Sequence, residues 1–297
     1  MRILLTGATG LIGQALCQRW QHQHQLICLS RDITKAQRKS NLAVHWTDNL
    51  TSVDFNQLDA VVNLAGEPIA AKRWTEQQKN RICQSRWQLT EQIAGAILQA
   101  NTPPQVLING SAIGFYGRQD SGSIDENFQT FYPDFSHDIC ARWENLAMRA
   151  QTAKTRVCIL RTGVVLSEQG GALSRMVPAY RLGLGGKLAD GQQYMSWIHL
   201  DDMVNIIEYM LLHSECHGIY NATAPMAVTN QQFSKLLAER LNKPELLPLP
   251  AFALRLMFGE MADLLLFGQQ VYPKRLLDAG FQFQYSQLRP ALASLAL

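Results

Sequence analysis

The stretch Arg2-Ile3-Leu4-Leu5-Thr6-Gly7-Ala8-Thr9-Gly10-Leu11-Ile12-Gly13 joins a short apolar run to three closely spaced glycines. The apolar run has the content of a buried parallel strand, and apolar residues recur at helical spacing after the glycines. The glycines therefore stand where a strand turns into a helix. At such a place Gly7 allows the tight turn, Gly10 lets the backbone approach a pyrophosphate, and Gly13 lets the helix pack against the sheet. The stretch predicts a dinucleotide-binding turn.

The spacing of these glycines is G-x-x-G-x-x-G, a variant of the more familiar G-x-G-x-x-G. A plain glycine-rich turn is the alternative, and the position between a strand and a helix argues against it. A Walker phosphate loop is excluded because the Gly-Lys-Ser/Thr ending is absent. We expect the phosphate-binding turn to be formed by Gly7, Thr9, Gly10, Leu11, Ile12 and Gly13.

The composition of the 297 residues excludes several classes of protein. The net charge is only +3 and no run of five Lys or Arg occurs, so neither nucleic acid nor a membrane surface is expected as a partner. The six cysteines include no C-x-x-C pair, and the chain opens directly into a strand without a signal sequence. No apolar run approaches membrane-spanning length. We expect a cytoplasmic protein that binds a small molecule and no metal.

Strand-like runs alternate with helical stretches through the first half of the chain, as in a doubly wound α/β sheet. The strand-like runs are 26–30, 44–46, 60–64, 106–110 and 157–161, and a long helix is expected over 76–99. After Arg161, glycines break the pattern before a strand returns near residue 218. We therefore predict a Rossmann-type domain over 1–168 plus about 197–225. A smaller discontinuous lobe is expected over 169–196 and 226–297, with a C-terminal module over about 247–295.

The end of the second strand decides which dinucleotide is expected. A carboxylate there pairs with ribose hydroxyls, whereas an arginine accepts a 2′-phosphate. This strand ends in Ser30 and Arg31, which offer a hydroxyl and a planar guanidinium. NADP(H) is therefore favoured over NAD(H), although Asp32 would supply a carboxylate if the strand ended one residue later.

Two further segments are candidates for the cofactor site. Leu64, Ala65 and Gly66 follow the fourth strand, where small residues let the backbone pass close to a ribose, and a simple strand-ending turn is the alternative. Arg86 lies in the long helix, where it would either reach a phosphate or stay solvated. Spacing alone does not decide between these two roles.

Together these segments resemble the extended short-chain dehydrogenase/reductase superfamily, and more narrowly the YfcH-type epimerase family. The resemblance covers essentially the whole chain. It is carried by the glycine turn, 63–69 (NLAGEPI), 72–75 (KRWT), 85–86, 111–117, 161–166, 197–202, and the tail from 273–276 through 280–281.

The resemblance implies a Rossmann-type domain with a C-terminal domain of unknown function. It also implies that Ser30 and Arg31 meet the 2′-phosphate, that Leu64 and Ala65 lie near the ribose, and that Arg86 is an additional cofactor contact. It does not specify a substrate, because the epimerase label comes from the superfamily.

The superfamily's reaction uses a Tyr-x-x-x-Lys pair, in which the lysine lowers the pKa of the tyrosine for proton transfer. None of the eight tyrosines here has lysine four residues later. Alignment on Trp143-Glu144 places Ser136 at the tyrosine position and Cys140 at the lysine position. A serine hydroxyl has too high a pKa to replace the phenol near neutral pH.

Ser111 and Tyr116 are the remaining catalytic candidates. Ser111 ends the fifth strand, where the superfamily places a substrate-orienting hydroxyl, and Tyr116 is either a relocated acid or a packing residue.

The sequence leaves two functions open. The first is an NADP(H)-dependent oxidoreductase or epimerase acting on a small carbonyl or sugar-nucleotide-like substrate. The second is a non-catalytic NADPH-binding sensor or scaffold. An apolar stripe over 254–266 is expected to form lobe core or a subunit contact, which leaves a homodimer open.

Overall fold

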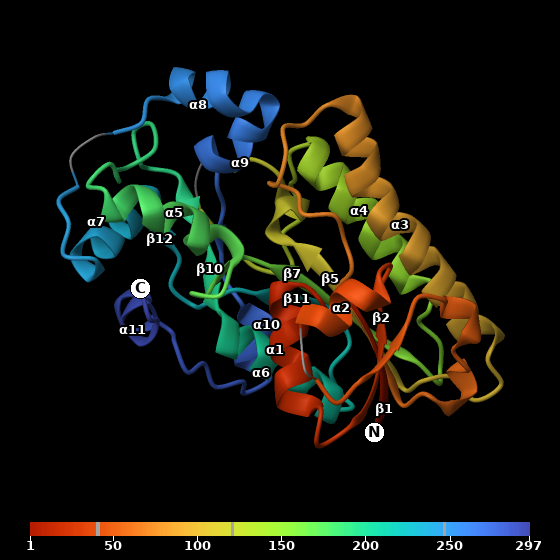
Figure 1. The fold of residues 1–297 in the computed structure, drawn as a ribbon. Coiled ribbons are helices and arrows are strands. Elements are labelled where there is room, and N and C mark those ends of the chain that lie inside the picture. Colours follow the sequence, from red (N-terminus) through yellow and green to blue (C-terminus); the bar gives the residue numbers. More distant parts are fainter. Residues whose placement is uncertain (40–41, 120–121, 246–247) are drawn as a thin grey trace.

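The computed structural model describes residues 1–39, 42–119, 122–245 and 248–297, which are built around one seven-stranded sheet (Figure 1). All strand pairs in this sheet are parallel. Read across the sheet, the strands are β11 (Gly218–Ala222), β7 (Arg156–Thr162), β5 (Val106–Ala112), β4 (Ala60–Asn63), β1 (Arg2–Thr6), β2 (Gln25–Leu29) and β3 (His45–Thr47). The chain starts at β1, winds outward to β3, and then winds outward in the other direction from β4. The predicted doubly wound, Rossmann-type α/β class is confirmed.

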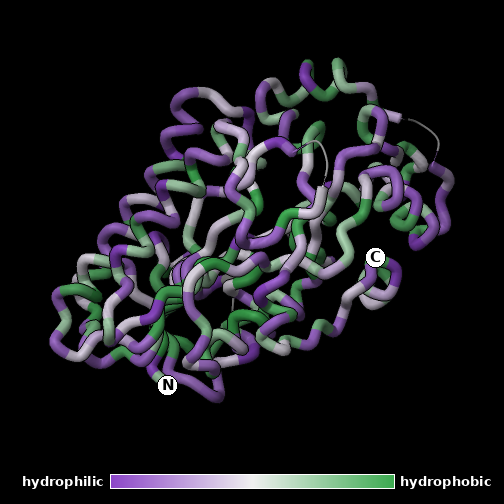
Figure 2. Tube along the Cα trace, turned by 180° about the vertical axis from the view of Figure 1, so that it is seen from behind, coloured by the Kyte–Doolittle hydropathy of each residue, from purple (hydrophilic) through white to green (hydrophobic). Residues whose placement is uncertain are grey.

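Helices cover both faces of this sheet, as parallel strands require. One face carries α1 (Leu11–Trp20), α2 (Ile33–Lys39) and α6 (Leu200–Leu212), and the other carries α3 (Glu76–Gln99) and α4 (Phe135–Met148). Figure 1 shows α3 and α4 side by side along one flank of the sheet. In Figure 2 the strands are mostly green and the outer turns mostly purple, so the apolar residues lie between the layers.

The long helix α3 spans the residues that its apolar spacing predicts. Its first turn is capped by Thr75, whose side chain accepts a hydrogen bond from the Gln78 backbone N–H. Pro103 and Pro104 follow its end and supply no backbone donor that could continue it. This helix brings Ser85 and Arg86 beside the ends of the central strands.

The smaller lobe has its own apolar core, formed by segments that are far apart in the sequence. It contains three two-stranded pairs: β8 (Val164–Leu166) with β10 (Trp197–His199), β9 (Tyr194–Met195) with β12 (Val228–Thr229), and β6 (Ser123–Ile124) with β13 (Gln270–Val271). Its helices are α5 (Gly171–Arg181), α7 (Asn230–Arg240), α8 (Ala251–Phe258), α9 (Asp263–Leu266) and α11 (Leu288–Ser294), whereas α10 (Lys274–Asp278) packs against β11 of the large sheet. Because α6 and β11 return to the large sheet between these segments, the lobe is discontinuous.

The C-terminal module reaches back to the start of α3, beside the large sheet, along the upper edge in Figure 1. Lys79 at the start of α3 forms a 2.6 Å ion pair with Glu260, and Arg118 pairs with Asp263. The predicted start of this module, at about residue 247, lies outside the described residues. No helix among the described residues is both long and apolar enough to cross a membrane.

Candidate functional site

The glycine turn between β1 and α1 leaves no room for a Cβ atom at Gly7 or at Gly13. Gly7 has a φ of +72°, and a Cβ on it would lie 2.6 Å from the Leu64 carbonyl oxygen. A Cβ on Gly13 would lie 2.2 Å from the Gly7 carbonyl oxygen, so α1 packs directly on the turn. Gly10 begins α1 and donates its N–H to the Gly7 carbonyl at 2.9 Å. The turn therefore presents bare backbone at the start of a helix, where anions bind.

A cavity of about 1670 Å³ opens beside this turn. Its wall brings together eight of the residues predicted to hold the cofactor: Gly7, Thr9, Gly10, Ser30, Arg31, Leu64, Ala65 and Gly66. It also includes residues that the sequence did not single out, among them Lys35, Asn49 and Gln88. The backbone cradle and the volume of the cavity leave room for a dinucleotide, which such folds bind at the carboxyl ends of the strands.

The other three predicted residues of the glycine turn, Leu11, Ile12 and Gly13, lie behind this wall and not on it. Leu11 and Ile12 are partly buried and pack against the core of the large sheet. Leu11 also lies against Gly171, where an added Cβ would be 3.1 Å from its Cδ2 atom. Their side chains, like the position of Gly13, therefore support the turn from below.

The part of the cavity wall that follows β2 carries two cations. Arg31 is 88% exposed, and its Nη2 atom lies 3.9 Å from Glu67 Oε2, too far for a strong pair. Lys35 lies one helical turn beyond it on the same cavity wall. The Asp32 carboxylate accepts the Lys35 backbone N–H at 2.8 Å, so it caps α2. Strand β2 ends at Leu29, which places Ser30 and Arg31 directly after it.

A buried network of polar side chains ties the central strands together beneath the site. The Thr6 hydroxyl donates to Asn63 Oδ1 at 2.6 Å and accepts the Ala65 N–H at 3.2 Å. The Asn63 amide donates to Thr90 and Asn109, at 2.8 and 2.6 Å. These bonds hold the ends of β1, β4 and β5 in register with α3. Sequence patterns showed Asn63 only as a strand end, because its partners are distant in the chain.

Arg86 is neither solvated nor on the cavity wall. Its guanidinium lies against Gly66, where an added Cβ would be 2.7 Å from Arg86 Cζ. Its Nη1 atom donates to the carbonyls of Glu67 and Ile82, at 2.9 and 3.0 Å. Burial lowers its pKa below the usual arginine value. The Arg86 guanidinium is therefore partly buried and held by the turn after β4.

Ser111 belongs to a buried ion-pair cluster. Its hydroxyl donates to Glu144 Oε1 at 2.6 Å, and Glu144 accepts two further bonds from Arg161 Nε and Nη2, at 2.9 and 2.8 Å. Burial alone would lower the pKa of Arg161, but the bonds and charge of Glu144 outweigh it and raise that pKa. Because the Ser111 proton is held by Glu144, its oxygen can only accept a bond from a ligand. Ser111 is 6% exposed.

Tyr116 is fully buried, a position that suits a packing residue better than a relocated acid. Its hydroxyl donates to Asn221 Oδ1 at 2.8 Å, and its ring packs with Ile124 and Val271. Burial raises its pKa above the usual tyrosine value, so the phenol is a poor acid near neutral pH. The packing alternative is the one that the structure supports.

A Tyr116→Phe variant tests this structural role. We expect the free energy of unfolding to fall by about 1–3 kcal/mol, because Asn221 Oδ1 would lose its donor in a buried place. Chemical denaturation followed by circular dichroism measures the change. An unchanged stability combined with loss of a measured turnover would instead return Tyr116 to the active site.

The positions of the missing tyrosine and lysine are occupied by small, neutral side chains. A Cβ on Gly114 would lie 3.1 Å from Ser136 Cβ and 3.9 Å from Cys140 Sγ, so the turn after β5 packs onto both. Burial raises the pKa of Cys140 to about 12, with the Glu144 charge adding to the shift. The thiol is therefore neutral. No phenol and ammonium pair forms at this face of α4.

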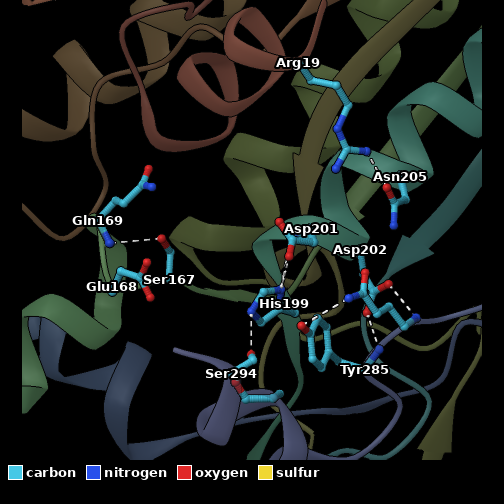
Figure 3. Close-up of polar contacts among 12 residues, drawn as sticks. Arg19, Ser167, Glu168, Gln169, His199, Asp201, Asp202, Asn205, Tyr285 and Ser294 are labelled. Atoms are coloured by element: carbon cyan, nitrogen blue, oxygen red, sulfur yellow. Dashed lines mark hydrogen bonds and ion pairs between the residues drawn. The ribbon is translucent and has the colours of Figure 1, made fainter. Parts of the chain in front are cut away.

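His199, Asp201 and Asp202 brace the two lobes (Figure 3). His199 Nδ1 accepts the Asp201 backbone N–H at 3.1 Å and so caps α6. Asp202 is fully buried and accepts the backbone N–H groups of Gln284 and Tyr285, at 2.8 and 2.9 Å. Figure 3 also shows His199 beside Ser294 of α11. No metal-binding cluster was found among the described residues.

Comparison with known proteins agrees with this architecture. Residues 3–223 match the model of the NAD dependent epimerase/dehydratase family, and residues 249–295 match the domain of unknown function DUF1731. The chain is 36% identical to the "Epimerase family protein SDR39U1 homolog, chloroplastic" of Arabidopsis thaliana, over 99% of this chain and 86% of the relative. It is 35% identical to the "Epimerase family protein SDR39U1" of Mus musculus, over 98% of both.

Solved structures give the same result. The crystal structure of human epimerase family protein SDR39U1, isoform 2, with NADPH superposes with a TM-score of 0.91 at 33% identity, covering 100% of this chain and 99% of that chain. A nucleoside-diphosphate sugar epimerase from Corynebacterium glutamicum gives a TM-score of 0.77 at 29% identity, covering 99% of this chain and 57% of that chain. The YfcH-type resemblance is therefore confirmed, and this chain belongs to the NAD dependent epimerase/dehydratase family, in its SDR39U1-like branch with a C-terminal DUF1731 domain.

Proposed function

We propose that this chain binds NADP(H) in the cavity at the carboxyl ends of β1, β2 and β4. The observation that carries this proposal is the combination of a bare glycine turn with Arg31 and Lys35 on one cavity wall. The turn would hold the pyrophosphate through backbone N–H groups, and the two cations would hold the 2′-phosphate. The NADPH bound to the human relative supports the same choice.

An Arg31→Ala variant tests the choice of dinucleotide. We expect NADPH affinity to fall about tenfold, because a charge-assisted bond to the 2′-phosphate contributes about 1.5–3 kcal/mol in a favourable site. NADH affinity should change little, since NADH lacks that phosphate. Isothermal titration of both dinucleotides against the wild type and the variant measures the two effects.

Arg38→Ala is the matched control for this experiment. Arg38 lies on α2, the helix that follows Arg31, and is exposed, but it does not line the cavity. We expect its removal to leave both affinities within about twofold, because a remote surface charge is screened by salt. Equal binding of NADH and NADPH by the wild type would refute the assignment of NADP(H).

A binding protein without turnover is the function that the geometry around α4 supports best. Ser136 and Cys140 occupy the places of the acid and its ammonium partner, and Tyr116 is sealed in the core. When bound, the nicotinamide would supply hydride chemistry, but these residues offer it no proton donor of matched pKa. A sensor or scaffold needs only the binding step.

An oxidoreductase or epimerase acting on a small carbonyl or sugar-nucleotide-like substrate is the second candidate, and family membership favours it. The two functions are separated by following the reduced nicotinamide absorbance with a panel of carbonyl compounds and nucleotide sugars. Product analysis by mass spectrometry, after the isomers are separated by chromatography, detects isomerisation that occurs without net oxidation of the nicotinamide. Sustained oxidation or isomerisation would overturn the sensor function, whereas tight binding without either would support it.

A further inference from the structure

Residues 66–75, which we call the strap, join the end of β4 to the start of α3 and border the cavity. Residues 66–68 at its beginning line the cavity wall. Within this fully described segment no residue belongs to a helix or a strand, and residues 70–73 are exposed. Trp74 closes the strap on itself by donating its Nε1–H to the Ile69 carbonyl at 2.9 Å. A surface segment of this kind takes its position from the contacts that reach it.

Helix α5 of the smaller lobe bridges the strap and the start of α1. Arg175 donates a hydrogen bond from Nη1 to the Ala70 carbonyl in the exposed part of the strap. Gly171, one helical turn earlier on the same face of α5, lies against Leu11, the first residue of α1. In such folds the dinucleotide crosses between the glycine turn after β1 and the segment after β4. Helix α5 therefore connects the two walls between which the ligand would lie.

The C-terminal module holds the other end of the strap. Lys79, in the first turn of α3, forms a 2.6 Å ion pair with Glu260. Arg73 donates from Nη2 to the Leu256 carbonyl at 3.4 Å. It also lies against Gly259, where an added Cβ would be 3.3 Å from the same nitrogen. Residues 256–260 therefore fix the place where the strap runs into α3.

The two lobes share the strap between them. Ile69 and Trp74 pack on the apolar cluster of α3 and α4, and the Glu67 N–H donates to Ser85 of α3 at 2.9 Å. The bonds to Ala70 and Arg73 come from the smaller lobe instead. Each of these exposed bonds is weak because water competes for it, but together they fix a segment that continues directly into the cavity wall.

We propose that the smaller lobe is a clasp, formed by Arg175, Leu256 and Glu260, which holds the strap against the cavity, so that NADP(H) enters and leaves only while these contacts are open. This inference rests on the proposed binding of NADP(H) and names what sets its exchange rate. Segments that close over a ligand commonly set its rate of release. The clasp gives the C-terminal module, which matches a domain of unknown function, a role in retaining the dinucleotide.

A clasp of this kind has a kinetic signature. Its contacts join protein groups to each other and need no ligand, so weakening them raises the open fraction with and without NADPH alike. A change that does not distinguish the free from the bound state leaves the affinity unaltered. Both the association and the dissociation rate should therefore rise by the same factor. Damage to the binding wall itself would weaken the affinity.

The test measures both rates by stopped-flow fluorescence of NADPH, with dissociation started by an excess of NADP⁺. We expect Arg175→Met and Glu260→Gln each to raise both rates about threefold, because each loses one exposed bond. The double variant should raise both about tenfold and keep Kd within about twofold of the wild type. Arg289→Met is the matched control, because Arg289 forms a similarly exposed ion pair with Glu239 between α11 and α7.

The pattern of rates separates the possible outcomes. If the wild type does not bind NADPH, the proposed function itself fails. If the wild type binds NADPH and the double variant keeps both wild-type rates, only the clasp is overturned. Faster dissociation with unchanged association would also overturn it, because the strap would then be part of the binding wall and not a gate.

Hydrogen exchange of the ligand-free protein gives a readout that is independent of NADPH. The N–H groups of Ala71 and Thr75 are bonded within the strap, and we expect them to exchange about threefold to tenfold faster in the double variant. Peptides from residues 85–99 of α3 should exchange at the wild-type rate. Unchanged exchange in the strap, or equal acceleration throughout α3, would overturn the inference.

Discussion

Replacing Arg161 with methionine is expected to lower the free energy of unfolding by about 3–5 kcal/mol. The change leaves Glu144 buried with Ser111 as its remaining donor, and both Arg161 and Glu144 are almost inaccessible to water. Arg161 also packs over Phe115, 3.4 Å from the ring centre, so the turn after β5 loses a contact. Urea denaturation of the wild type and the variant measures the difference.

The double variant Arg161→Met/Glu144→Leu is the matched control for the ion pair. Removing both charges avoids an unpaired buried carboxylate, so we expect the double variant to be more stable than Arg161→Met alone. Arg142→Met, on the exposed side of α4, should change stability by less than about 0.5 kcal/mol. A single variant that loses under 1 kcal/mol, by the same measure, would show that the pair does not hold β5, β7 and α4 together.

Replacing Gly13 with alanine is expected to weaken NADPH binding roughly tenfold to a hundredfold. Its Cβ would lie 2.2 Å from the Gly7 carbonyl oxygen and 2.7 Å from the Ala8 Cα, which are backbone atoms. The start of α1 must therefore move away from the turn that would hold the pyrophosphate. Isothermal titration gives the affinity, and thermal denaturation shows whether the fold is also weakened.

Gly95→Ala controls for the effect of replacing a helical glycine. Gly95 lies inside α3, and no atom is found within 4 Å of an added Cβ there. We expect the change to stabilise the protein by up to about 1 kcal/mol, because alanine favours the helix more than glycine does. If Gly13→Ala behaves like Gly95→Ala and binds NADPH as the wild type does, the close packing of α1 on the turn is not needed for binding.

The fold could be predicted because its signals are local. Most strands of the large sheet are short apolar runs, and α3 begins and ends at the residues that its spacing and the following prolines predict. The cofactor turn is also local, since the strand, the glycines and the helix are contiguous. The backbone cradle and the residues after β2 and β4 were therefore predictable from position alone.

The roles of polar side chains could not be predicted in this way. Tyr116 meets Asn221, which is 105 residues away in sequence, and Ser111 meets Glu144, which is 33 residues away. Lys35 joins the cavity wall only because α2 folds back beside β2. No periodicity in the sequence reports such partners, so a buried tyrosine and a catalytic tyrosine look alike before the chain is folded.

The sequence by itself therefore determined the doubly wound sheet, the dinucleotide turn and the absence of a Tyr-x-x-x-Lys pair, because each depends on residues that are close together in the chain. Only the tertiary structure decided which polar groups remain available to a ligand. It sealed Tyr116 in the core, tied the Ser111 proton to Glu144 and placed Arg86 beneath Gly66. The physical reason is that the free energy of a polar group depends on the partners that reach it after burial, and those partners come from strands and helices far apart in the sequence.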